Sequence, residues 1–220
     1  MGNRLGIMGM VFGKIIVETP KYEVIKSTTD YEIRHYPPSV IAEITYDPTQ
    51  MKGQDKDGGF SILANYIGVL GKPQNTTTQK IDMTSPVITK AEKIDMTSPV
   101  ITKKPEKIDM TSPVITQDHA SDEGKVTMQF ILPEKYKKAE EAPKPVDERV
   151  VIKEEGGRKY GVVKFSGIAT NEVVSQKVEK MKKDLERDGV KIVGEYVLAR
   201  YNPPWTLPPF RTNEIMIPVE

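Results

Sequence analysis

Residues Tyr160–Asp188, YGVVKFSGIATNEVVSQKVEKMKKDLERD, join a β-strand pattern to the clearest helical pattern in the chain. Tyr160–Phe165 is short and rich in aromatic and β-branched side chains, which is typical of a strand. Thr170–Asp188 carries one apolar stripe at helical spacing, formed by Val174, Val178, Met181 and Leu185. We expect Asn171 to cap this helix and Gly189 to end it.

The same order of patterns occurs in the first part of the chain. Tyr31–Tyr46 contains two strand-like runs that break at Pro37-Pro38, where a proline pair favours a bulge or kink. A helix follows, with apolar side chains at helical spacing: Phe60, Leu63, Ile67 and Leu70. Gly71 is its expected C-cap. Val126–Leu132 is then a compact apolar strand.

The second part of the chain contains three more predicted strands, at Val150–Glu154, near Tyr196–Arg200 and at Glu214–Val219. Gly156-Gly157 predicts a hairpin between Val150–Glu154 and Tyr160–Phe165. Each half of the chain therefore has the order strand, helix, strand, strand. This order predicts an α+β fold in which two similar units share one sheet.

These patterns also predict the domain organisation. We expect a flexible leader over residues 1–20 and a single domain over residues 21–220. Half 1 of that domain covers about residues 22–135, and half 2 covers about residues 148–220. The Lys/Glu/Pro-rich stretch between the halves has little to bury and is expected to be a solvated loop.

The ten-residue sequence KIDMTSPVIT occurs three times, at Lys80–Thr89, Lys93–Thr102 and Lys107–Thr116. Each copy predicts one strand, and a sheet has one place for such a strand. We therefore interpret residues 80–116 as a tripled strand insertion tolerated in a surface loop, because closure entropy rises slowly with loop length. The third copy has the shorter connection to the strand at Val126–Leu132, and the first copy has the shorter connection to the preceding helix.

Composition excludes several classes of protein. The 220 residues carry 32 basic and 31 acidic side chains, so the net charge of +1 gives no electrostatic reason to expect nucleic acid. The chain has no cysteine, which excludes disulfides and thiolate ligands. It has no run of 18 apolar residues and no secretory signal pattern, so we expect a cytoplasmic protein without a membrane span.

No catalytic motif is visible, and the chain has two histidines. His35 shares a strand face with Tyr31 and Ile33, where a neutral imidazole is a candidate ligand for a heme iron. The alternative is a partly buried histidine bonded to a backbone carbonyl near the proline kink. His119 lies in a polar stretch and is expected to be a loop residue. The repeated methionines are expected to pack in the core, with iron ligation as the alternative: Met83, Met96 and Met110.

Three motifs in order resemble the SOUL/heme-binding protein family. The repeated word contains an I-x-M-T-[AS]-P-V segment, Tyr31–Tyr36 (YEIRHY) is similar to the family's opening strand, and the closing stretch combines Tyr201–Trp205 (YNPPW) with Arg211–Ile215 (RTNEI). The variant PPWTLPPF at Pro203–Phe210 resembles the plant branch. The resemblance implies a distorted antiparallel β-barrel flanked by two helices, which agrees with the order of patterns.

The resemblance also implies a ligand, a heme or another tetrapyrrole. In one heme-ligating member the proposed iron ligand is the histidine of the Arg-His-Tyr motif, which corresponds to His35. Apolar residues of the first helix offer a slot for the macrocycle, and cations nearby can hold its propionates. The heme-binding set that we predict is His35, Arg34, Phe60, Leu63, Tyr66, Ile67, Lys72, Arg200 and Trp205.

Some of these residues have duller alternatives. Where family members carry basic residues on the first helix, this chain has Asp57 and Asn65, so that propionate contact departs from the family's pattern. Arg211 is expected to form a salt bridge or a backbone bond. Trp205 sits among prolines and can form a wall of the ligand groove, a plug that closes the barrel or a contact for another protein.

The function implied is therefore a soluble tetrapyrrole-binding protein that carries or buffers heme or porphyrin, is not an enzyme and passes its ligand to an unidentified protein acceptor. The alternative from another class is a protein-interaction module with incidental tetrapyrrole affinity. An enzyme acting on a hydrophobic small molecule is a third alternative, which the missing catalytic groups disfavour.

Overall fold

The structure, a computed structural model, describes residues 11–15, 17–47, 59–91, 125–202 and 205–220. Within these residues nine strands form one antiparallel sheet in the order β1-β2-β7-β9-β8-β4-β5-β3-β6. The elements are β1 (Glu23–Ser27), β2 (Glu32–Tyr36), β3 (Ser39–Tyr46), α2 (Gly59–Ile67), β4 (Val87–Ala91), β5 (Val126–Ile131), β6 (Val151–Glu155), β7 (Arg158–Phe165), α3 (Asn171–Arg187), β8 (Val197–Arg200) and β9 (Asn213–Val219). Short 3-10 helices η2 (Ala139–Glu141) and η3 (Pro208–Phe210) lie in the connections.

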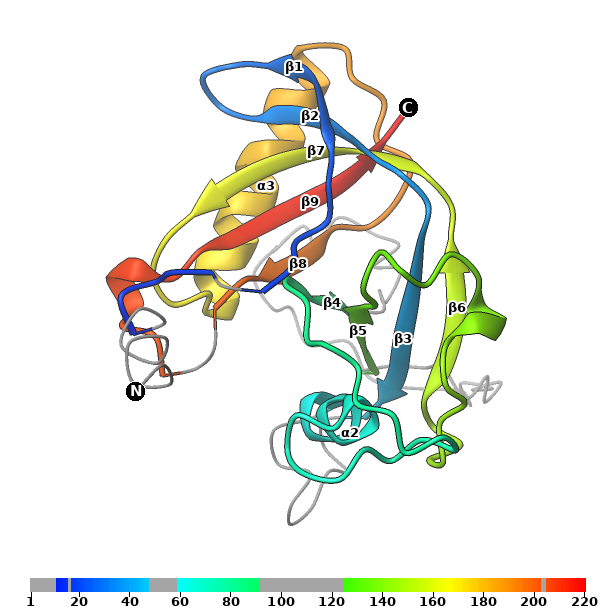
Figure 1. The fold of residues 1–220 in the computed structure, drawn as a ribbon. Helices are drawn as coiled ribbons and strands as arrows, with labels where there is room; N and C mark the ends of the chain where they lie inside the picture. Colours follow the sequence, from blue (N-terminus) through cyan, green and yellow to red (C-terminus); the bar gives the residue numbers. More distant parts are fainter. Residues whose placement is uncertain (1–10, 16, 48–58, 92–124, 203–204) are drawn as a thin grey trace, which may run out of the picture.

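The sheet consists of two halves with the same internal order. In the first half β3 leads through α2 to β4 and β5, and in the second half β7 leads through α3 to β8 and β9. The last strand of each half lies between the other two, so β5 pairs with β3 and β4, and β9 pairs with β7 and β8. The halves join where β4 pairs with β8. The predicted α+β fold of two strand-helix-strand-strand units in one sheet is confirmed (Figure 1).

The strands that precede these halves exchange partners. β2 continues into β3 through Pro37-Pro38, but β2 pairs with β7 of the other half, while β3 pairs with β6. Tyr36 lies opposite Arg158 and Ser39 lies opposite Glu155, so the register is the same on both sides of the bend. The two bent strands thus bring opposite ends of the strand order together. The sheet curls into a distorted half-barrel, as predicted.

The predicted hairpin at Gly156-Gly157 is wrong. Among the described pairings, β6 and β7 share no ladder, because each pairs with a different part of the bent β2–β3 strand. Gly-Gly therefore bends one long strand opposite the kink at Pro37-Pro38. The approach is close, since a Cβ on Gly157 would lie 3.2 Å from the carbonyl oxygen of Tyr36.

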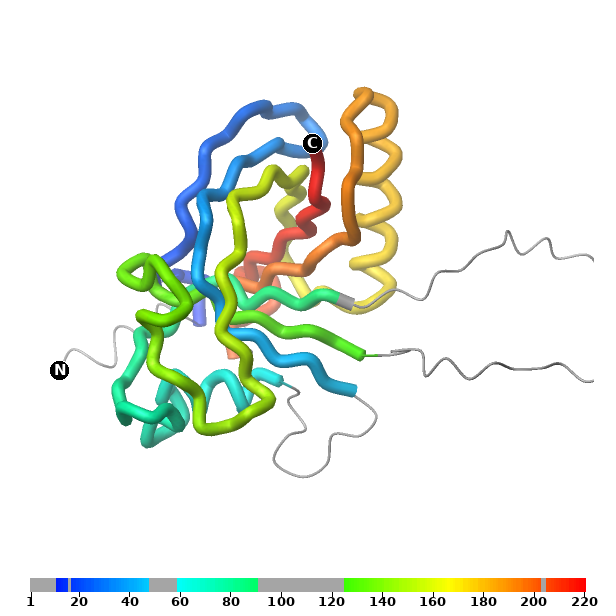
Figure 2. Tube along the Cα trace, turned by 90° about the vertical axis from the view of Figure 1, so that its right-hand side faces the viewer, coloured from blue at the N-terminus to red at the C-terminus, as the bar shows by residue number. Residues whose placement is uncertain are grey.

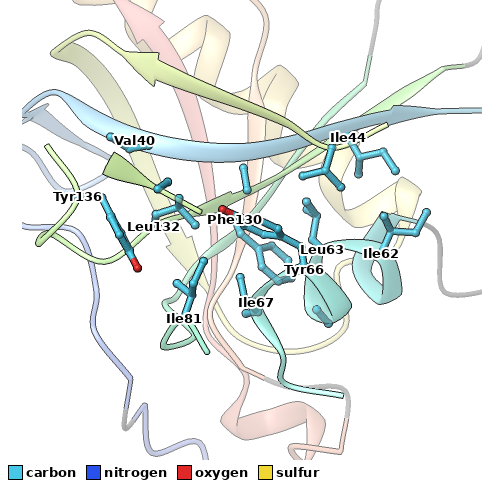
Figure 3. Packing of buried hydrophobic residues seen from close by; sticks show 14 residues of the cluster. Val40, Ile44, Ile62, Leu63, Tyr66, Ile67, Ile81, Phe130, Leu132 and Tyr136 are labelled. Atoms are coloured by element: carbon cyan, nitrogen blue, oxygen red, sulfur yellow. The ribbon is translucent and has the colours of Figure 1, made fainter. Parts of the chain in front are cut away.

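Each helix covers the outer face of its own half. α2 packs on β3 and β5, and α3 packs on β7 and β9; Figure 2 shows α3 outside the curled sheet. The predicted stripe of α3 is buried in full: Val174, Val178, Met181 and Leu185. Residues of α2 interdigitate with β3 and β5 in a second cluster, where Leu63 and Tyr66 meet Phe130 (Figure 3). A third cluster on the inner face contains no helical residue among its members.

The ends of both helices differ from the prediction. α2 ends at Ile67 rather than near Gly71, because Gly68 takes a left-handed φ of +82° and Val69 donates its N–H to the carbonyl of Ala64, a Schellman ending. Leu70 is consequently exposed. At the start of α3 the cap is Thr170, not Asn171, since the Thr170 hydroxyl accepts from the N–H of Val173.

The first copy of the repeat supplies the sheet strand. Its last residues form the beginning of β4, which pairs with β5 and β8. Ile81, Met83 and Val87 of this copy belong to the cluster under α2, as the alternation predicted. The other two copies, Lys93–Thr102 and Lys107–Thr116, lie outside the described residues. The shorter connection to α2 thus outweighs the shorter connection that the third copy has to β5.

Residues 11–18 lie against the C-terminal part of the chain. The rings of Phe12 and Phe210 meet edge-on with 5.7 Å between their centroids, and the N–H of Leu207 donates to the carbonyl of Val11. Glu18 forms a single bridge with Thr84. The predicted boundary of the leader at residue 20 stays a prediction. No helix in the described ranges is long and apolar enough to span a membrane.

Candidate functional site

His35 lies at the edge of a groove of about 800 Å³ at the end of the sheet where β7 begins and β9 ends. It occupies the face of β2 that carries Tyr31 and Ile33, as the alternation predicted, and its side chain is partly buried. Its Nε2 atom lies 3.4 Å from where a Cβ on Gly157 would be. Over the described part of the chain, neither ring nitrogen of His35 takes part in a hydrogen bond. The imidazole is therefore free to accept a ligand.

Lys159 is the direct partner of His35 across the β2–β7 ladder, so the two side chains lie next to each other on one face. It lines the same groove. No carboxylate within salt-bridge distance of Lys159 is found among the described residues. The neighbouring Arg158 differs, because it lies 3.4 Å from Glu155. Lys159 is thus the cation of the groove with its charge uncommitted.

The opposite wall of the groove is formed by the loop before β8 and by the end of β9. Val193, Tyr196 and Pro218 supply apolar surface there, and Val193 is exposed. Gly194 allows this loop to approach Pro218, whose Cγ would lie 3.2 Å from a Cβ at that position. The groove therefore combines apolar walls with an imidazole and a free ammonium group, which suits a flat apolar molecule with an acidic edge.

Arg34 follows the opposite direction from His35 and lies on the inner face of the sheet. Its guanidinium lies 2.7 Å from Glu32 and 3.0 Å from Glu214, and it donates to the hydroxyl of Tyr36. Its ring of partners includes Tyr22, over which the guanidinium stacks at 4.2 Å. Although burial opposes the charge, these partners raise the pKa of Arg34 further above its ordinary value. Its charge is committed to the protein.

Two chain segments distant in sequence match the SOUL family. The model of the SOUL heme-binding protein matches residues 17–107 and 101–218, which together cover most of the chain. The chain belongs to the SOUL heme-binding protein family. The finer resemblance to the plant branch, which rests on residues 203–210, stays a prediction.

Solved structures share the fold of this SOUL chain at low sequence identity. The C-terminal domain of EcmrR has a TM-score of 0.53 at 10% identity, covering 90% of this chain and 98% of that chain. A hydrolase from Listeria innocua has a TM-score of 0.51 at 11% identity, covering 89% and 94%. An uncharacterized conserved protein from Listeria innocua has a TM-score of 0.50 at 13% identity, covering 93% of each chain. These likenesses show the fold alone. Comparison with curated proteins gives no match.

The structure does not bring the first-helix residues of this SOUL chain near His35. Leu63, Tyr66 and Ile67 are at most 1% exposed and fill the core between α2 and the sheet (Figure 3). The Tyr66 hydroxyl donates to the carbonyl of Pro143 at 2.8 Å, and the ring of Phe60 meets that of Phe130 edge-on. None of these side chains lines the groove. The residues that correspond to an apolar slot in the prediction form packed core here.

The remaining predicted cations are also away from the groove. Lys72 is exposed in the turn after α2. Arg200 lies on the outer face, where it donates to the Thr89 hydroxyl and burial lowers its pKa. Arg211 bonds the backbone, as predicted, since its Nε donates to the carbonyl of Thr206 at 2.8 Å. Lys56, Asp57, Met96, Met110 and His119 lie outside the described residues.

Trp205 is 60% exposed in the loop between β8 and β9. Leu207 and Phe210 of the same loop are also exposed, and Phe12 adds its ring beside Phe210. The loop is fixed at its base, where Asn202 donates to the carbonyl of Gly13 and accepts from the N–H of Thr212. Trp205 therefore does not plug the half-barrel. Its indole is available to an external partner.

Sequence reasoning missed Lys159 and the loop before β8. Lys159 stands in a run of charged residues, GGRKY, and such runs usually mark a solvated face. Only the pairing of β2 with β7 places it beside His35, and that pairing links residues more than a hundred positions apart. Val193 carried no signal of its own.

Proposed function

We propose that this SOUL-family chain binds a tetrapyrrole, heme or its metal-free porphyrin, in the groove beside His35 and carries or buffers it without catalysis. The observation that supports this most directly is the pair His35 and Lys159 on one strand face, with the imidazole nitrogens free and the ammonium group uncommitted. The volume of about 800 Å³ lies within the usual range of clefts that hold small molecules.

The residues of the groove fit the parts of the ligand. A neutral imidazole such as that of His35 is a common axial donor to heme iron. The ammonium group of Lys159 suits a propionate, as a charge-assisted hydrogen bond. Val193, Tyr196 and Pro218 offer apolar contact to a macrocycle. When heme is bound, its iron supplies the coordination bond, and the rest of the binding is hydrophobic and common to heme and free porphyrin.

The carrier role follows from the same features. Capture in an open groove at the rim of the sheet is reversible, and an unidentified protein acceptor can approach the bound ligand there. The chain carries none of the common nucleophile–base motifs, so we assign no catalysis to it. A cytoplasmic location remains part of this proposal.

A protein-interaction module is the second candidate. It is favoured by the exposed apolar side chains around the loop between β8 and β9, which include Trp205 and Phe210. In that case tetrapyrrole affinity would be incidental.

A parallel titration with hemin and metal-free protoporphyrin separates the two candidates. The carrier predicts a saturable one-to-one endpoint in the Soret region for both ligands, with hemin bound more tightly because of the iron bond. A shallow, non-saturating rise with both ligands would contradict the carrier and support the interaction module.

A further inference from the structure

A second space lies on the inner face of the half-barrel, away from both helices. It is a cavity of about 190 Å³. Its walls include three tyrosines and three apolar side chains: Tyr36, Tyr160, Tyr201, Ile88, Val197 and Met216. Residues 18–21 and 37–38 border its mouth. His35 and Lys159 do not line it, so the cavity is separate from the groove in the two residues that matter most there.

The size of the cavity limits its ligand. An apolar protein cavity of about 150 Å³ holds one benzene molecule, whereas clefts for drug-sized molecules start at about 300 Å³. A space of about 190 Å³ therefore suits a single ring with a small substituent. A tetrapyrrole, which contains four pyrrole rings, is too large for it.

The charges around the cavity cancel. The charged side chains that line it are three lysines and three glutamates: Lys21, Lys90, Lys137, Glu18, Glu134 and Glu155. Lys90 lies 3.1 Å from Glu155, and Glu134 lies within reach of both Lys21 and Lys137. Because an ionised ligand would be desolvated without a free counter-charge, the site favours a neutral molecule.

The walls also offer aromatic and polar contacts. The rings of Tyr36 and Tyr160 lie edge to face with 5.8 Å between their centroids, an arrangement that accommodates another ring. Tyr136 lines the cavity as well and is 8% exposed. Among the described residues its hydroxyl is the buried side-chain polar atom that has no hydrogen-bond partner. A ligand hydroxyl that reached it would satisfy that atom.

From size, charge and polarity together we propose that the inner cavity is a second ligand site, which takes one small neutral monocyclic phenol. The ring lies among Ile88, Met216 and the tyrosines, and the ligand hydroxyl exchanges a hydrogen bond with Tyr136. This site is independent of tetrapyrrole binding in the groove.

Phenol and toluene test the proposal, because they share size and differ in the hydroxyl group. We expect saturable one-to-one binding of both by calorimetry, with phenol bound about five-fold more tightly. The variant Ile88→Phe fills the cavity and should weaken both probes at least ten-fold, while hemin titration is unchanged. The variant Tyr136→Phe should remove the preference for phenol and leave toluene unaffected.

Methyl NMR of the unmodified protein provides a readout that does not depend on a variant folding. Phenol should shift the methyl signals of Ile88 and Met216, whereas those of Ile81 under α2 should stay in place. Absence of saturable binding, or equal binding by Ile88→Phe, would overturn the proposal. So would shifts confined to Val193 in the groove.

Discussion

The guanidinium of Arg34 lies 3.0 Å from the carboxylate of Glu214 on the inner face of the half-barrel, and both side chains are less than 10% exposed. Arg34 belongs to the opening strand motif YEIRHY, and Glu214 belongs to the closing motif RTNEI. The hydroxyl of Tyr201 donates to the other oxygen of the same carboxylate at 2.7 Å. Two of the motifs that resemble the SOUL family thus meet in one buried polar network.

This ion pair is expected to matter for stability rather than for ligand binding. The variant Arg34→Met leaves the Glu214 carboxylate buried without its counter-charge, so we expect it to lower the free energy of unfolding by about 3–5 kcal/mol. Urea unfolding measures the change. Arg158→Met is the matched control, because its pair with Glu155 is half exposed, and it should cost less than about 1 kcal/mol. Equal costs for the two variants would contradict the prediction.

Alkaline pH is expected to destabilise the fold. Burial raises the pKa of five tyrosines, among them Tyr31, whose pKa rises to about 12: Tyr31, Tyr36, Tyr66, Tyr160 and Tyr201. Above pH 10 the unfolded chain loses phenolic protons that the folded chain keeps, so the free energy of unfolding is intact below about pH 10 and falls as pH rises further.

Urea unfolding at pH 8 and pH 11 measures this loss. The variant Tyr66→Phe isolates the tyrosine contribution from that of the lysines, which titrate in the same range. Its stability should fall less between the two pH values than that of the unmodified protein. The same loss in both proteins would show that Tyr66 ionises as readily when folded as when unfolded.

If His35 binds the iron, His35→Ala should shift the Soret maximum of the hemin complex and weaken hemin much more than metal-free protoporphyrin. The physical reason is that only hemin loses a coordination bond. His119→Ala is the matched control, since the chain has no other histidine, and it should leave both affinities unchanged. Unchanged spectra in His35→Ala would leave the groove as a hydrophobic site without an iron ligand.

Lys159 should act on the propionates and not on the iron. We expect Lys159→Gln to weaken hemin and protoporphyrin by the same factor, about five-fold, which corresponds to about 1 kcal/mol for an exposed ionic contact. The loss should shrink at high salt, because screening weakens exposed ion pairs. Lys164→Gln, in the same strand but outside the groove, should have no effect. A loss restricted to hemin would argue against a propionate contact.

The sequence was sufficient for features that depend on local pattern. The apolar stripe of α3 and the repeated order of elements predicted both helices, the two halves and the sheet, because amphipathic periodicity is set within one element. His35 was placed on the correct strand face for the same reason. The helix ends were less accurate, since Gly68 and Thr170 competed with equally suitable neighbours, Gly71 and Asn171.

Partner choice between distant strands could not be predicted in the same way. Gly156-Gly157 has the sequence of a hairpin turn, yet β6 and β7 find better partners in the two arms of the bent β2–β3 strand. That non-local pairing is what places Lys159 beside His35 and turns Arg34 inward. Phe60, Leu63, Tyr66 and Ile67 were assigned to a ligand slot because they are apolar, but apolarity alone does not distinguish a slot from a packed core.

The repeat allows the same substitution to be tested in three identical sequence contexts. Ile81 of the first copy is fully buried under α2, and its N–H donates to the carbonyl of Ile67. Ile81→Ala should therefore lower the free energy of unfolding by about 2–5 kcal/mol. Ile94→Ala and Ile108→Ala, at the equivalent positions of the other copies, should change it by less than about 0.5 kcal/mol. Thermal or urea unfolding of the three variants measures the difference.

Deletion of residues 93–105, one repeat unit with its linker, completes the test. Because the first copy already forms β4 and a shorter loop changes closure entropy little, the deletion should leave both stability and hemin binding intact. In the shortened protein Ile81→Ala should cost the same as in the full chain. A near-neutral Ile81→Ala in the full chain that becomes costly after deletion would show that the copies exchange places in the sheet. Collapse of the deletion variant would show that the tripled sequence is part of the fold.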